Sequence, residues 1–242
     1  MNEARPAFYA LAPGGWRDFI TLLHPPYTLW HLSYVAIGAA IAPHFNAGIM
    51  GLTLLAFFLA MGIGAHALDE LVGRPLQTRI STRVLIALAV TSIAAAAVIG
   101  VIVAVQRNLW LLAFVAVGSV LVVAYNLELF GGRLHGDLWF ALGWGAFPVL
   151  TAFFACAEEL RVEAIAAAAF AALLSHAQRV LSTPVRDVRR RVASVSGRIE
   201  WRDGRTEPLD TDSLKRVPEQ ALQILSAAVV LLAVALVLMR VT

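Results

Sequence analysis

The chain has 242 residues, of which 60% are hydrophobic and 14% are charged, and its mean hydropathy is +0.76. A soluble domain carries about one quarter charged residues, so this composition excludes an ordinary soluble protein and indicates a membrane protein. The net charge of +3 does not indicate a nucleic-acid partner, because the basic residues collect in short segments beside apolar runs.

Seven apolar runs approach the ~20 residues that a helix needs to cross ~30 Å of hydrocarbon. They lie at roughly 28–45, 47–66, 83–105, 109–126, 138–157, 161–182 and 219–241. The runs are apolar all round rather than alternating with period two, which excludes a transmembrane barrel. We therefore predict an all-α, polytopic membrane bundle of about seven transmembrane helices.

The chain divides into four parts in this interpretation. They are an interfacial N-terminal segment 1–27, a six-span bundle 28–182, a basic loop 183–218 and a last transmembrane helix 219–241. Trp16 and Arg17 suit headgroup depth in the first part. In the third, Asp203-Gly204 predicts a two-stranded hairpin, and Asp210 or Thr211 is expected to cap the following helix.

The basic residues also predict an orientation. Of 19 Lys and Arg, only Arg107, Arg161 and Arg240 fall on one side of the expected membrane. The richer side should be cytoplasmic, so we expect an integral protein of a bacterial or archaeal plasma membrane with its N-terminus and active face in the cytoplasm. The arginine run after residue 185 can also contact anionic membrane lipids.

A pair of acidic residues lies at the end of the second run. Carboxylates here can hold Mg²⁺, a hard cation that prefers oxygen ligands, so we predict that Asp69 and Glu70 bind the metal and act in catalysis. His66 lies one helical turn before Asp69 and is a third catalytic candidate. Arg74 and Arg79 can bind the phosphate of a substrate. The alternative is a solvated helix end with an internal Asp–Arg pair.

Further polar residues lie at other span ends on the same side. His176 and Arg179 are three residues apart on one helix face and can contact an anionic substrate group. The alternative is an interfacial histidine beside an arginine that extends to the headgroups. Asn126 is a candidate polar contact to the substrate, and Asp137 is expected to cap the fifth span.

Three segments with distinctive residues follow one another along the chain. They are His24-Pro25-Pro26-Tyr27-Thr28-Leu29, the stretch from Ala65 to Leu76 with Gly73-Arg74-Pro75-Leu76, and the stretch from Leu134 to Val149. Over about residues 20–190 this succession resembles the UbiA-type intramembrane prenyltransferase family. The resemblance implies a UbiA-like helical bundle around a lipid-facing cavity, where Mg²⁺ on two aspartate-rich motifs holds a prenyl diphosphate.

The aspartate-rich motifs depart from the family pattern. Only Asp69 remains of the first motif, with Glu70 as a substitute, and Ser175, Gln178 and Arg179 stand near the carboxylate positions of the second. We therefore expect a divergent prenyltransferase that moves a prenyl group from its diphosphate to a lipophilic acceptor. The alternative is a non-catalytic protein or complex subunit that binds an isoprenoid or lipid phosphate. Both of these functions require the side chains of four residues to face one cavity, namely Asp69, Arg74, His176 and Arg179.

Overall fold

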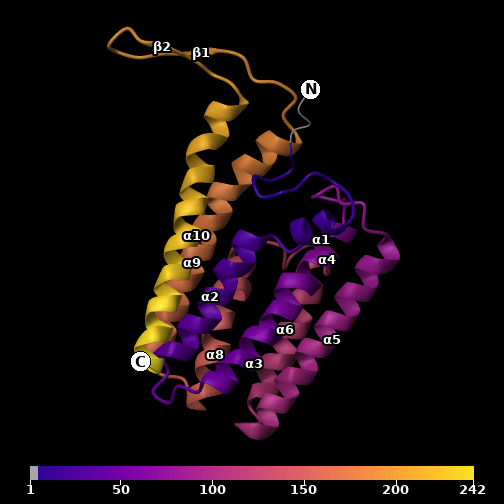
Figure 1. Cartoon of the computed structure of the whole chain (residues 1–242), viewed down its shortest axis with the longest axis vertical. Helices are drawn as coiled ribbons and strands as arrows, with labels where there is room; N and C mark the ends of the chain where they lie inside the picture. The colour runs from indigo at the N-terminus through magenta and orange to yellow at the C-terminus, as the bar shows by residue number, and fades with distance from the viewer. Residues whose placement is uncertain (1–4) are drawn as a thin grey trace.

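The computed structural model describes residues 5–242, so the first four residues of the expected interfacial segment lie outside it. The chain is a helical bundle with a small hairpin (Figure 1). In chain order the elements are α1 Trp16–Leu22, α2 Pro25–Ile41, α3 Ala47–Phe57, η1 Phe58–Ala65, α4 His66–Leu71, α5 Thr82–Gln106, α6 Leu111–Asn126, α7 Asp137–Phe140, η2 Ala141–Ala146, α8 Phe147–Ala157, α9 Val162–Arg190, β1 Arg198–Glu200, β2 Thr206–Pro208 and α10 Thr211–Val241.

Five helices are long and apolar enough to cross a membrane, as an integral membrane protein requires. They are Ala47–Leu71, Thr82–Gln106, Asp137–Ala157, Val162–Arg190 and Thr211–Val241. The predicted helical membrane bundle is confirmed at this level. The other two expected spans correspond to α2 and α6, which have only 17 and 16 helical residues.

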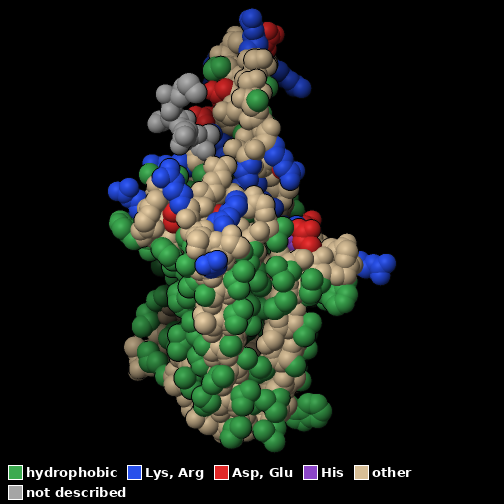
Figure 2. Space-filling model, turned by 90° about the vertical axis from the view of Figure 1, so that its right-hand side faces the viewer, with side chains coloured by type: hydrophobic (Ala, Val, Ile, Leu, Met, Phe, Trp, Pro, Cys, Tyr) green, Lys and Arg blue, Asp and Glu red, His purple; other side chains and the backbone are tan. Residues whose placement is uncertain are grey.

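Charge divides the molecule into two ends. Figure 2 shows hydrophobic side chains over the lower part and Lys and Arg over the upper part. We call the upper part, with residues 5–24, 72–81, 127–136 and 191–210, the charged end. At the opposite end, Arg107 donates to the carbonyl oxygens of Ala155 and Cys156, and Arg240 donates to that of Ala42. These two arginines therefore satisfy carbonyls where α8 and α2 end.

Two helices widen into π-helical turns at the same depth of the bundle. The η1 and η2 segments each contain two glycines, and π-helical turns are rare and frequent at functional sites. A Cβ on Gly145 in η2 would lie 2.5 Å from the Ala171 carbonyl oxygen, so only glycine allows α9 to pack this closely. His31 of α2 contacts the Trp144 carbonyl of η2, and His66 contacts the Gly62 carbonyl of η1.

Gly38 on α2 lies against the backbone of α8, and we predict that Gly38→Ala destabilises the bundle by about 1–3 kcal/mol through overpacking. The added methyl would overlap the Val149 carbonyl oxygen, which cannot move without separating the helices. Gly51→Ala on α3 is the matched control, because a Cβ there meets nothing within 4 Å and improves helix propensity. Reversible unfolding in detergent measures both, and equal stabilities would contradict this account.

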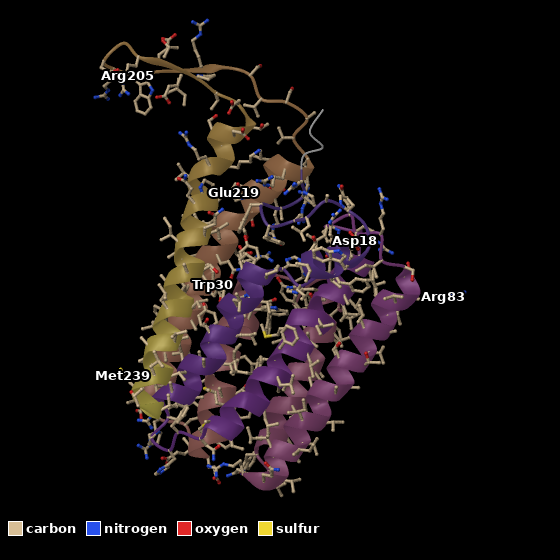
Figure 3. The ribbon with its side chains drawn as sticks, viewed as in Figure 1. Asp18, Trp30, Arg83, Arg205, Glu219 and Met239 are labelled. Carbon is tan, nitrogen blue, oxygen red and sulfur yellow. The ribbon has the colours of Figure 1, made fainter. Side chains whose placement is uncertain are left out.

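The helices α9 and α10 extend past the bundle at the charged end and carry the hairpin (Figure 1). The predicted hairpin is confirmed, with Gly204 at φ +85°, and Asp210 caps α10 in a capping box with Ser213. The predicted loop 183–218 is too long, because only residues 191–210 lie outside the helices. The helices continue through Pro184 and Pro218, and Arg189 makes a two-pronged ion pair with Glu219 between them (Figure 3).

Candidate functional site

A polar cavity opens at the charged end between the bundle and the chain's first described residues. Its empty space amounts to about 970 Å³, a volume that includes the part open to solvent. Its lining combines histidines, tyrosines and arginines from α2, α4, α6, η2 and α9. The polar and aromatic residues are Phe8, Tyr9, His24, Tyr27, His31, His66, Asp69, Tyr125, Asn126, His135, Phe140, Trp144, Gln178, Arg179, Ser182, Arg186 and Arg190.

Positive charge dominates this cavity, because among residues 5–242 its lining has three guanidinium groups and a single carboxylate, that of Asp69. Arg179 donates to the Tyr125 hydroxyl at 2.7 Å and pairs with Asp137 at 2.9 Å. Arg186 and Arg190 form no ion pair with any of residues 5–242. A buried cluster of this kind favours an anion, and guanidinium groups suit phosphate oxygens.

Asp137 illustrates how the fold uses a residue differently from its expected role. The N-terminal cap of α7 is Gly136, and no side chain caps that end. The Asp137 carboxylate instead accepts from Arg179 Nε across to α9, so the expected capping role is wrong. The pair fixes Arg179, whose guanidinium lies 5.3 Å from the centroid of the Phe140 ring.

Three cavity histidines are fixed by backbone carbonyls. His31 Nδ1 lies 2.9 Å from the Trp144 oxygen, His66 Nδ1 lies 3.1 Å from the Gly62 oxygen, and His135 Nδ1 lies 2.9 Å from the Tyr125 oxygen. A carbonyl only accepts, so each Nδ1 carries the proton. This geometry leaves Nε2 as the ring nitrogen that can contact a ligand.

An N-terminal strap, residues 5–11, crosses the mouth of the cavity. Tyr9 makes a 2.7 Å hydrogen bond between its hydroxyl and His24 Nδ1, and Arg190 Nε donates to the Pro6 carbonyl at 3.4 Å. The His24 ring stacks on His66 with centroids 4.1 Å apart. Burial raises the pKa of the Tyr9 phenol well above its usual range, so the hydroxyl keeps its proton. The strap therefore shields the cavity with aromatic rings and backbone.

His24 should make the protein's stability depend on pH. Burial, with His66, Arg190 and Arg186 nearby, lowers the pKa of His24 well below its usual 6.5. As the pH falls below about 6.5, the unfolded chain takes up this proton first, so the free energy of unfolding should decrease by up to about 1.4 kcal/mol per pH unit. Above that pH the contribution is constant.

The variant His24→Phe keeps a ring to stack on His66 but cannot titrate. We expect its stability to fall less steeply than that of the native protein between pH 6.5 and 5.5, measured by unfolding in detergent. His176→Gln, at an exposed histidine of α9, should keep the native slope. Parallel curves for His24→Phe and the native protein would contradict the assignment.

A second, apolar cavity lies deeper in the bundle, away from the charged end. It encloses about 860 Å³ and is lined by small and aliphatic side chains of α3, η1, α5, α6, η2 and α8. A small pocket of about 220 Å³ lies between the two cavities. It shares His31 and His66 with the polar cavity, Phe57 and Met61 with the apolar cavity, and Trp144 with both. Trp144 is therefore a wall that the two cavities share.

The chain matches no known protein family, no curated protein and no solved structure. The resemblance to UbiA-type prenyltransferases thus stays a prediction, and the chemistry has to be argued from the cavities themselves.

The structure brings together four of the eight predicted site residues. His66, Asp69, Asn126 and Arg179 line the polar cavity. The other four, Glu70, Arg74, Arg79 and His176, do not line it. The expected convergence of Asp69, Arg74, His176 and Arg179 on one cavity is therefore wrong for two of its four members.

The segment after α4 explains why three of these residues are absent from the cavity. Glu70 is fully buried, and its carboxylate accepts from the backbone N–H groups of Leu76 and Thr78 and from the Thr78 hydroxyl, each at 2.9 Å. Arg74 donates to the Ile80 carbonyl at 2.6 Å. Arg79 is exposed and uses its backbone N–H to contact Asp18 (Figure 3). These groups hold the segment 72–81 in place.

The fourth residue, His176, is exposed on the outer side of α9, although it is three residues from Arg179. Gln178, Arg186 and Arg190 were not among the predicted site residues, yet they line the cavity from that helix. The spacing of these residues and Arg179 places their side chains on one face of a helix. This placement could be predicted only if the helix were known to continue through Pro184.

The described residues do not suit the predicted Mg²⁺. Within residues 5–242, no group of three or more His, Cys, Asp and Glu side chains could hold a metal ion. Glu70 is engaged by its own loop, so Asp69 is the one acidic side chain in the lining. A single carboxylate among arginines is a poor cation site, because Mg²⁺ requires several oxygen ligands.

Proposed function

We propose that this protein binds an isoprenoid or other lipid phosphate, with its phosphate in the polar cavity and its apolar tail in the deeper cavity. The sharing of Trp144 by the two cavities, with a small pocket between them, carries this proposal. A ligand that fills both must be charged at one end and apolar at the other. This is the second of the two functions considered from the sequence, and it needs neither a metal nor Glu70.

The charges of the polar cavity favour a phosphate head group over a neutral head group. Arg186 and Arg190 approach from successive turns of α9, and neither has an acidic partner among residues 5–242. A phosphate can accept from both guanidinium groups and from Arg179 at once. Bound there, it would lower the mutual repulsion of three like charges, which favours binding.

The apolar cavity supports a flexible, unbranched or prenyl tail. Its lining is mostly aliphatic and aromatic, and it includes Gly100, Gly118 and Gly143, where neighbouring side chains pack closely against the helix backbone. Along α5 the lining runs from Ile93 to Val103, which corresponds to about 15 Å of helix at 1.5 Å per residue. Burying a tail of this length would contribute most of the affinity.

A prenyl-transfer reaction is the second candidate, favoured by the aromatic rings at the wall that the two cavities share. Trp144 lies with its ring centroid 4.3 Å from Tyr125 and 5.6 Å from Phe140. When the C–O bond of an allylic diphosphate breaks, these ring faces would stabilise the cation while the arginines stabilise the leaving group. Attack by a lipophilic acceptor would complete the transfer, and its proton would pass to Nε2 of a neutral His31.

The test compares three probes on purified protein in detergent, by native mass spectrometry or titration. Farnesyl phosphate has both parts, farnesol lacks the phosphate, and inorganic phosphate lacks the tail. We expect saturable binding of farnesyl phosphate at least about 100-fold tighter than that of either part. Equal affinities for farnesyl phosphate and farnesol would overturn the proposal.

Ser119→Phe supplies the control for the tail. Its ring would occupy part of the apolar cavity from α6 and leave the polar cavity intact. We expect it to weaken farnesyl phosphate binding, with a smaller effect on a short prenyl phosphate such as dimethylallyl phosphate. Incubation with labelled farnesyl diphosphate and membrane lipid extract, followed by product analysis, then tests transfer separately from binding.

A further inference from the structure

Two polar side chains that line the polar cavity have no role in holding the fold. No hydrogen bond or ion pair from residues 5–242 engages the Asp69 carboxylate. Gln178 is 4% exposed, and its Oε1 is one of only two buried side-chain nitrogen or oxygen atoms in the described chain without a partner. The other is Nε2 of His24, which lines the same cavity. A buried polar atom without a partner, such as Gln178 Oε1, is costly, whereas Asp69 is half-buried and its side chain lines the cavity.

A bare phosphate cannot satisfy these groups. The Asp69 carboxylate, when ionised, only accepts hydrogen bonds, and a phosphate anion has only acceptors to offer. An amide can exchange its two ends by a half-turn, so the argument rests on Asp69, with Gln178 as support. Asp69 belongs to α4, and Gln178 belongs to α9, the helix that also carries the three arginines of the cavity.

We propose that the head group of the ligand carries hydroxyl or amine donors in addition to its phosphate, and that Asp69 and Gln178 select for them. This inference rests on the proposed lipid-phosphate function and specifies its substrate class. The arginines would bind the phosphate, and the carboxylate would accept from the O–H or N–H groups attached beyond it. A hydrogen bond to a charged acceptor contributes about 1.5–3 kcal/mol, so the selectivity should be about 10-fold or more.

Asp69 has a competing explanation, because it could balance the charge of Arg186 and Arg190 without contacting a ligand. The two roles make opposite predictions for substitution. If Asp69 only balances charge, its removal should strengthen the binding of every phosphate ligand equally. If it accepts from the head group, its removal should erase the preference for donor-bearing heads.

The test uses three probes with the same geranylgeranyl tail, whose heads are methyl phosphate, phosphoethanolamine and phosphoglucose. All three are phosphodiesters, so their phosphates carry the same single charge and lack a proton of their own. We expect the native protein to bind at least one donor-bearing probe about 10-fold more tightly than the methyl phosphate probe. The two donor-bearing probes distinguish an amine from a sugar.

Four variants decide the outcome. Asp69→Leu should abolish the preference, and Asp69→Asn should keep part of it for hydroxyls but not for the amine. Gln178→Met should reduce the preference, and the exposed His176→Gln should leave it unchanged. Equal binding of all three probes to the native protein, or an unchanged preference in Asp69→Leu, would overturn this inference. Failure of all three probes to bind would instead overturn the proposed function.

Discussion

Replacing Glu70 with alanine is expected to lower the free energy of unfolding by about 3 kcal/mol or more. The carboxylate is fully buried and accepts three hydrogen bonds from Leu76 and Thr78. Without it, two backbone N–H groups and one hydroxyl lose their acceptor, and an unsatisfied buried donor costs about 1–3 kcal/mol. Reversible unfolding in detergent measures the loss. Lower expression at 37 °C should accompany it.

Asp69→Ala is the matched control, one residue away and of the same charge. Because Asp69 makes no hydrogen bond or ion pair with residues 5–242, its loss should change stability by less than about 1 kcal/mol. A metal site built from both acids would give the reverse pattern, in which either variant alters metal affinity and neither alters folding greatly. Similar destabilisation by the two variants would contradict the division of roles drawn here.

The adjacent acids show what the sequence could and could not provide. It placed both at the end of the second apolar run, and the structure confirms that position. The sequence could not assign different roles to the two acids, because the direction of each side chain depends on how far the helix continues. The helix continues to Leu71, which directs Asp69 to the cavity and Glu70 to the loop that follows.

The helices themselves were largely predictable, because long apolar runs and the Asp203-Gly204 turn are local signals. The effect of prolines on where the helices end could not be predicted. Pro184 favoured a stop, yet α9 continues for six residues beyond it, supported by the pair of Arg189 with Glu219 from α10. That partner is 30 residues away, so no local pattern indicates it. The cavity's arginines depend on this continuation.

The polar cavity was only partly predictable for the same reason. Asp69 and Arg179 carry charge beside apolar runs and stand out in the sequence. His31 and Trp144 do not, because each is embedded in an apolar helix. Their role comes from the π-helical turn of η2, whose Trp144 carbonyl His31 contacts across 113 positions of sequence.

The double variant Arg186→Gln, Arg190→Gln is expected to bind farnesyl phosphate about 100-fold more weakly than the native protein. Each guanidinium would contribute one charge-assisted contact worth about 1.4 kcal/mol or more, a factor of about 10 in affinity. Folding should be preserved, because neither arginine has an ion-pair partner within residues 5–242. The free energy of unfolding, measured beside the affinity, establishes this.

Arg191→Gln distinguishes a built site from general attraction to anions. Arg191 follows Arg190 directly, but its side chain is 81% exposed and pairs with Asp187 outside the cavity. If the arginine run only attracts anionic lipid surfaces, each arginine should contribute about equally, and binding should weaken strongly with salt. If the cavity binds the phosphate, Arg191→Gln should change affinity less than twofold. Comparable losses for the single Arg190→Gln and Arg191→Gln variants would therefore argue against a phosphate site in the polar cavity, whatever the double variant shows.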